Sequence, residues 1–150
     1  MPGSVVIFVC LVMLFLLFHE SGHIIAAKIC RLTVRKAGLK WVPVPHLYVI
    51  VDASVKQSSE YIFYFSGFFA TLLLFAILYA TDLLRHDVIY YAIALQVVLD
   101  SNPFFSDFTL AFSKEYKYSK LWYLHFVLWG VLLGFLFSRP SDVVVLFSTP

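Results

Sequence analysis

The 150-residue chain is 61% hydrophobic and 13% charged, with a mean hydropathy of +0.88 and a formal net charge of +2. This apolar content excludes an ordinary soluble domain and a disordered chain, and the small net charge gives no basis for binding nucleic acid. We therefore expect residues 1–150 to form a single polytopic all-α membrane domain in contact with the lipid bilayer.

Long apolar runs predict about four transmembrane helices. The hydrocarbon core of a bilayer is crossed by about 20 apolar residues, and the runs that reach this length are 5–27, 61–80, 88–112 and 121–137. The third run contains Pro103, which lacks a backbone N–H and should break or kink the helix there. In the fourth run, Gly130 and Gly134 have a spacing that allows another helix to pack closely.

The segment between the first two runs has a different pattern. Apolar and polar side chains alternate near Leu32 and Val34, and again near Val49 and Val51, with a proline-containing stretch in between. Period-two alternation on both sides of a turn predicts a short membrane-associated β-hairpin within residues 31–55. The alternative is an irregular basic loop.

The basic residues predict an orientation in the membrane. Nine of the eleven Lys and Arg residues lie in the loops at 28–56 and 113–120, whereas Arg85 and Arg139 lie on the other side of the four spans. The positive-inside rule then places these basic loops in the cytoplasm and both termini outside.

The run HESGH at residues 19–23 is the clearest chemical signal in the chain. Two histidines four residues apart on a helix project from one face, about 40° apart, so His19 and His23 can reach one metal ion. Glu20 lies beside the pair, where it can take a proton from a water molecule on the metal. Three ionisable groups inside a membrane-length apolar run are costly, which favours a functional role over a pair of buried structural histidines.

A catalytic zinc takes three protein ligands and leaves one position open, so a third ligand is needed from another helix. His19 lies about fourteen residues into the first span, and Asn102 lies equally far into the third, which enters from the same side. Asp100 and Asp107 should therefore reach the depth of the histidines. Either can be the third ligand, and Asp100 can instead hold a ligating imidazole from outside; His125 is a further candidate for a polar contact at the site.

With these motifs, the chain resembles the site-2 protease family of intramembrane zinc metalloproteases, in a minimal form without an inserted PDZ-type domain. Members carry H-E-x-x-H in the first core helix, a membrane-associated β-hairpin after it, and an Asn-Pro motif ending in Asp-Gly in the third core helix. The corresponding residues here are 19–23, 31–55 and 102–107. The resemblance covers residues 5–112 and leaves 121–137 as an extra span.

The resemblance implies that His19, His23 and Asp107 bind one zinc ion and that Glu20 activates the water. It also implies that Asn102 holds the substrate carbonyl or stabilises the oxyanion. The expected activity is zinc-dependent cleavage of a membrane-embedded or membrane-tethered protein near the cytoplasmic face.

Some positions differ from the family pattern. Phe108 occupies the position of the family glycine, the spacing from Asn102 to Asp107 is short, and Gly67-Phe68 replaces a Gly–Pro-like pair in the second core helix. These differences leave open the alternative that the protein is a degenerate relative, which binds zinc or a membrane partner and does not cleave that partner. A purely structural membrane protein with a chance motif is a third alternative.

Overall fold

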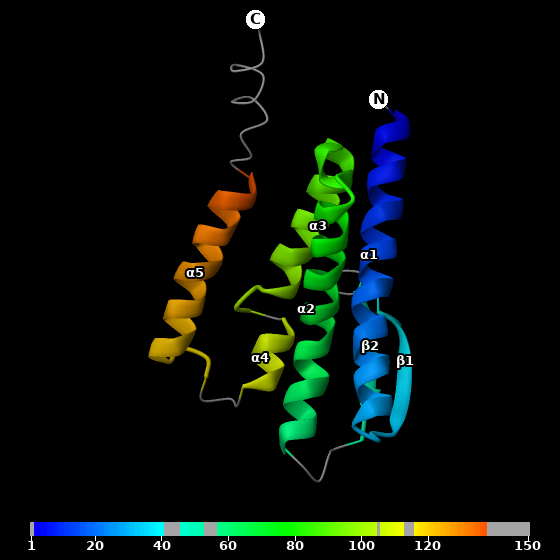
Figure 1. Cartoon of the computed structure of the whole chain (residues 1–150). Coiled ribbons are helices and arrows are strands. Elements are labelled where there is room, and N and C mark those ends of the chain that lie inside the picture. Colours follow the sequence, from blue (N-terminus) through cyan, green and yellow to red (C-terminus); the bar gives the residue numbers. More distant parts are fainter. Residues whose placement is uncertain (1, 41–45, 53–56, 105, 113–115, 138–150) are drawn as a thin grey trace, which may run out of the picture.

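The computed structural model describes residues 2–40, 46–52, 57–104, 106–112 and 116–137. Within them the chain is mostly helical, with a two-stranded antiparallel sheet (Figure 1). The elements in chain order are α1 (Pro2–Ile29), β1 (Val34–Lys40), β2 (His46–Val51), α2 (Gln57–Ala80), the 3₁₀ turn η1 (Leu83–Arg85), α3 (Asp87–Asp100), α4 (Asp107–Ala111) and α5 (Lys120–Phe137).

Helices α1 and α2 are long and apolar enough to cross a membrane, over Ser4–Ile29 and Ser58–Ala80. They match the first two spans expected from the sequence. The third expected span, 88–112, is divided: α3 has 14 residues, about 21 Å of helix, and α4 begins seven positions after α3 ends. Helix α5 is apolar but shorter than the two long helices. The described residues therefore do not form four unbroken spanning helices.

The helices alternate in direction along the molecule. In Figure 1, α1 and α3 run one way while α2 and α5 run the other, and α4 continues the path of α3 towards the end where α2 begins. The core forms where α3 packs on α1 and α2, with Ala92 and Ile93 of α3 fully buried against Phe15 and Leu78. This packing carries the C-terminal end of α3 towards the middle of α1.

Helices α1 and α2 approach one another closely at two glycines. At Gly22, an added Cβ would lie 2.6 Å from the carbonyl oxygen of Ser66 and 2.9 Å from Cβ of Ala70. Gly67 makes the reciprocal approach from α2, towards the histidine face of α1. By contrast, no described atom lies within 4 Å of a Cβ built at Gly130 or Gly134, so the close-packing face expected on α5 is open in the described part of the chain.

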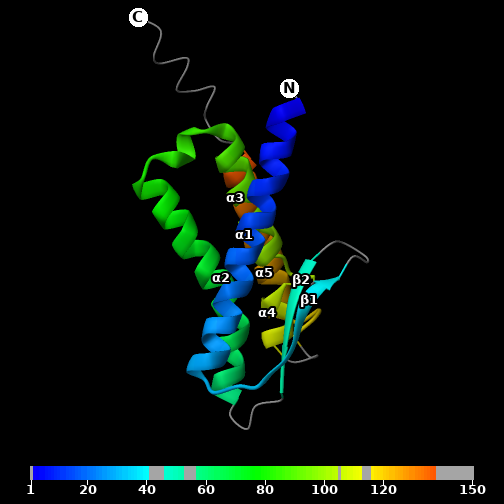
Figure 2. The same ribbon diagram turned by 90° about the vertical axis from the view of Figure 1, so that its right-hand side faces the viewer.

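The expected β-hairpin is present. Strands β1 and β2 pair antiparallel, with Val34 opposite Val51 and a register irregularity next to Arg35, whose side chain forms an ion pair with Asp52. The hairpin lies alongside the C-terminal half of α1 in both views (Figures 1 and 2), and β2 contacts that helix. The remainder of the expected hairpin region, at 41–45 and 53–55, lies outside the described residues.

Substitution Gly22→Ala tests the close packing of α1 on α2. The added methyl group meets backbone rather than a flexible side chain, so we expect the free energy of unfolding to fall by about 1–3 kcal/mol. Gly130→Ala is the matched control, because its methyl group meets open space and helix propensity alone favours alanine by up to about 1 kcal/mol. Thermal unfolding in detergent measures both, and equal stabilities of the two variants would contradict the packing described here.

Candidate metal centre

The two motif histidines come from consecutive turns of α1 and face the interior of the molecule. Their Nε2 atoms are 3.2 Å apart, and the rings meet edge to face at 76°. Both residues are buried, at 6% exposed for His19 and 4% for His23. Because α1 is continuous through residues 19–23, this arrangement follows directly from the four-residue spacing.

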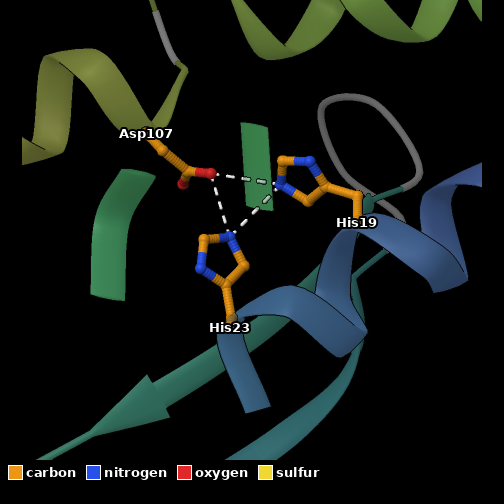
Figure 3. Close-up of side chains that lie close together, drawn as sticks. All are labelled: His19, His23 and Asp107. Atoms are coloured by element: carbon orange, nitrogen blue, oxygen red, sulfur yellow. Dashed lines mark hydrogen bonds and ion pairs between the residues drawn. The ribbon is translucent and has the colours of Figure 1, made fainter. Parts of the chain in front are cut away.

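Asp107, the first residue of α4, completes the group. Its Oδ2 lies 3.1 Å from Nε2 of His19 and 2.9 Å from Nε2 of His23. Figure 3 shows the three side chains pointing towards one another, the carboxylate from α4 and the rings from α1. The Asp107 side chain keeps 20% of its exposure, so the group is more open on the α4 side than at the rings. His19, His23 and Asp107 thus form a group that could hold a metal ion.

The other nitrogen of each ring is held by an acceptor. Nδ1 of His19 donates to Oδ2 of Asp100 at 2.8 Å, and Nδ1 of His23 donates to the carbonyl oxygen of Phe63 at 2.7 Å. A carbonyl oxygen can only accept, and a carboxylate also accepts, so each neutral ring carries its proton on Nδ1. The Nε2 lone pairs of both rings are then directed at the space they share with Asp107.

Asp100 supports His19 from outside the group. Its carboxylate also accepts hydrogen bonds from Thr71 at 2.5 Å and from Gln96 at 2.7 Å, and all of these residues are buried. Of the two roles that the sequence left open for Asp100, its contact with Nδ1 matches the supporting one. Supporting carboxylates of this kind orient an imidazole and make its free nitrogen a better ligand.

The resulting geometry could accommodate a cation. Two bare imidazole nitrogens and a carboxylate oxygen converge at 2.9–3.2 Å from one another in an apolar bundle. A proton on one of the two Nε2 atoms still leaves the lone pairs of the other Nε2 atom and of the carboxylate oxygen facing each other. A metal ion would instead attract all three atoms. Ligands of a tetrahedral zinc ion at ordinary bond lengths are about 3.3 Å apart, so the triangle fits zinc within a few tenths of an ångström.

Gly67 of α2 forms the wall of this space. An added Cβ at this position would lie 2.5 Å from Nε2 of His19 and 2.5 Å from Nε2 of His23. Any other residue would therefore place carbon against the two ligand atoms. The sequence indicates that Gly67 allows close helix contact and places it in a family-like dipeptide, but it does not predict this approach to the two histidines.

Glu20 lies beside the metal-binding group, whereas the Asn102 side chain is hydrogen-bonded within its own loop. Glu20 is half-buried on α1, about 60° around the helix from His23, which leaves its carboxylate beside the group and not within it. Asn102 is 2% exposed, and its amide is engaged in its own loop: it donates to the carbonyl oxygen of Leu99 and accepts from the backbone N–H of Phe104 at 3.0 Å. A role for Asn102 towards substrate stays a prediction.

Phe108 and His125 lie next to the group without joining it. The Phe108 ring packs on Phe65 and Phe68 of α2, at centroid distances of 5.1 and 4.9 Å, and on His125 of α5 at 5.5 Å. The residue in the family's glycine position thus packs between α2 and α5. The polar contacts of His125 are with Tyr116 and the backbone of Ser101, not with the metal ligands.

In comparisons with known proteins, no family model matches the chain, and neither a curated protein nor a solved structure matches it at a significant level. The chemistry of the site therefore has to be argued from its own geometry.

Substitution Gly67→Ala should abolish metal binding. Alanine favours the helix by up to about 1 kcal/mol, so α2 should remain intact while its methyl group displaces the two Nε2 atoms. Gly134→Ala adds the same group to α5 where nothing lies within 4 Å, and it should bind metal like the wild type. The measurement is the metal content after purification in zinc-containing buffer. Full zinc occupancy in Gly67→Ala would contradict the assignment of Gly67 as the wall of the site.

The two aspartates should respond differently to substitution. Asp107→Ala removes a ligand atom, so bound zinc should fall from about one ion per chain to almost none. Asp100→Asn keeps an oxygen that accepts from Nδ1 of His19, so the ion should remain with affinity about 10- to 100-fold weaker. Zinc titration against a competing chelator distinguishes them, and the reverse order of effects would make Asp100 the ligand.

Proposed function

We propose that the protein is a zinc-dependent intramembrane endopeptidase of the site-2 protease kind. The observation that carries this proposal is the convergence of two imidazole nitrogens and a carboxylate oxygen on one point, beside a glutamate of α1. Three protein ligands with one position left open are the arrangement of catalytic zinc sites, whereas structural zinc sites use four.

The donor set alone also suits non-haem iron, which binds two histidines and one carboxylate. Glu20 favours hydrolysis, because a carboxylate beside the ligands is the group that a metallopeptidase uses as its base. When bound, zinc would polarise the scissile carbonyl and lower the pKa of a water molecule towards about 7. Glu20 would take the proton from that water at a carboxylate oxygen and pass it to the leaving amine.

The surroundings of the group support a substrate that lies in or at the membrane. The two histidines are held by α1, one of the two helices long enough to span a bilayer, and the more open side of the group faces α4. The hairpin runs along the same half of α1, where an extended peptide could add to one of its strands. A peptide must be extended to be cut, since a helix keeps its carbonyl oxygens occupied.

We extend the proposal to a multi-pass topology with the basic loops in the cytoplasm and both termini outside. Lys28 lies in the last turn of α1, at the end of the molecule where α2 begins, and the exposed basic residues Arg31, Arg35 and Lys36 follow it in the chain. The broken α3–α4 segment and α5 would supply the two further crossings. Cleavage would then occur near the cytoplasmic face.

A second candidate function is binding without cleavage. Phe108 packs between α2 and α5 where the family has a glycine, and the Asn102 amide is engaged with its own backbone. A protein of this kind would keep the metal and a membrane partner but would not hydrolyse it.

Substitution Glu20→Gln separates the two functions. It should leave zinc content unchanged and reduce cleavage of a co-expressed single-span membrane protein at least about 100-fold, because general bases contribute rate factors of 10² or more. Glu60→Gln removes a carboxylate at the start of α2 and should cleave like the wild type. Zinc binding with no cleavage by the wild type would favour the binding function, and unchanged cleavage by Glu20→Gln would refute the assigned base.

A further inference from the structure

The break between α3 and α4 leaves backbone carbonyl oxygens without their helical donors. In a continuous helix each carbonyl accepts from the N–H four residues later, and Pro103 has no N–H to give. Within an apolar environment these oxygens need other partners, because no water replaces the lost donors.

Part of the replacement comes from the loop itself. The side-chain amide of Asn102 donates to the carbonyl oxygen of Leu99, and the hydroxyl of Ser106 donates to that of Asn102. These bonds close the turn on itself, but they do not attach it to the rest of the protein.

The remaining donors come from one face of α5. Nε1 of Trp129 donates to the carbonyl oxygen of Val98 at 3.0 Å. Nε2 of His125 donates to that of Ser101 at 2.7 Å, and Nε1 of Trp122 donates to that of Pro103 at 2.8 Å. The three donors are spaced by three and four residues, which places them on one side of a helix. They meet successive parts of the break, from the last turn of α3 to the proline.

We propose that α5 is a positioning helix whose Trp122, His125 and Trp129 fix the α3–α4 break and thereby aim Asp107 at the two imidazoles. This inference rests on the proposed function, since it concerns the third ligand of the same metal group. Asp107 follows Pro103 by four residues, so a change in the direction of the break moves its carboxylate relative to α1.

Two further contacts hold His125 in the required orientation. The Tyr116 hydroxyl lies 2.6 Å from Nδ1 of His125, and burial raises the pKa of that hydroxyl, so it keeps its proton and donates it. Nε2 is then the nitrogen that donates to Ser101. On its other side the His125 ring packs on Phe108, the residue directly after Asp107.

The other half of α5 packs differently. Leu136 is 4% exposed and lies in an apolar cluster with Ala94, Val97 and Val98 of α3. Removing that packing should weaken the attachment of α5 without removing a donor from the break. Leu136→Ala therefore serves as a control for stability alone.

The test compares His125→Phe and Trp122→Phe, which keep an aromatic ring but lack the donor, with Leu136→Ala in the full-length detergent-solubilised protein. Zinc affinity is measured by competition, and the ligand geometry is measured from the absorption spectrum of bound Co²⁺. We expect zinc affinity about 10- to 100-fold weaker and an altered cobalt spectrum in the two aromatic variants. His125→Gln restores an N–H donor and should recover affinity and spectrum, whereas Leu136→Ala should lower the unfolding temperature and leave the spectrum unchanged.

The inference is overturned if a Trp122→Phe, His125→Phe double variant keeps the wild-type affinity and cobalt spectrum. It is also overturned if Leu136→Ala alters the spectrum to the same extent, because α5 would then act only through stability. A wild-type protein that binds neither zinc nor cobalt would instead remove the proposed function and this inference with it.

Discussion

Three lone pairs directed at one point, on side chains of which the two histidines are buried, determine what the surrounding structure has to provide. Nε2 of His19, Nε2 of His23 and Oδ2 of Asp107 lie within 3.2 Å of one another, and none of them carries a proton when both rings are neutral and protonated on Nδ1. Such a contact is repulsive without a cation. Each neighbouring element therefore contributes something that either orients these groups or leaves space between them.

Helix α2 orients the two imidazoles and leaves space for their Nε2 atoms along a single face. Phe63, Gly67 and Thr71 are spaced four residues apart and contribute, in order, a carbonyl acceptor for His23, a gap at the two Nε2 atoms, and a hydroxyl on the carboxylate that holds His19. The close contact of Gly22 with α2 sets the distance between α1 and this face of α2. Helix packing and ligand geometry are thus determined by the same few residues, and a wider separation would remove both ring orientation and the wall of the site.

The sequence predicted the parts of this site that depend on local spacing. The histidine pair, the two long spans and the hairpin follow from periodicity, and the equal depth of His19 and Asn102 brought the correct segments together. Spacing and depth left open the choice between Asp100 and Asp107, for which only the family resemblance implied Asp107, since the direction taken by the chain after Pro103 depends on tertiary contacts. The acceptor for His23 is a backbone carbonyl, which every residue has, and a glycine whose function is an absent Cβ looks like any other small residue in an apolar helix.

The break in the third segment follows from the same requirement. Asp100 and Asp107 lie against opposite nitrogens of the His19 ring, at 2.8 and 3.1 Å. In an unbroken helix, carboxylates seven residues apart are separated by about 10 Å along the axis, too far to reach both sides of one imidazole. A helix that supplies both the outer support and a ligand must therefore be interrupted between them. Irregular backbone in an apolar environment is tolerated only where its polar groups find partners, and here α5 supplies donors to the break.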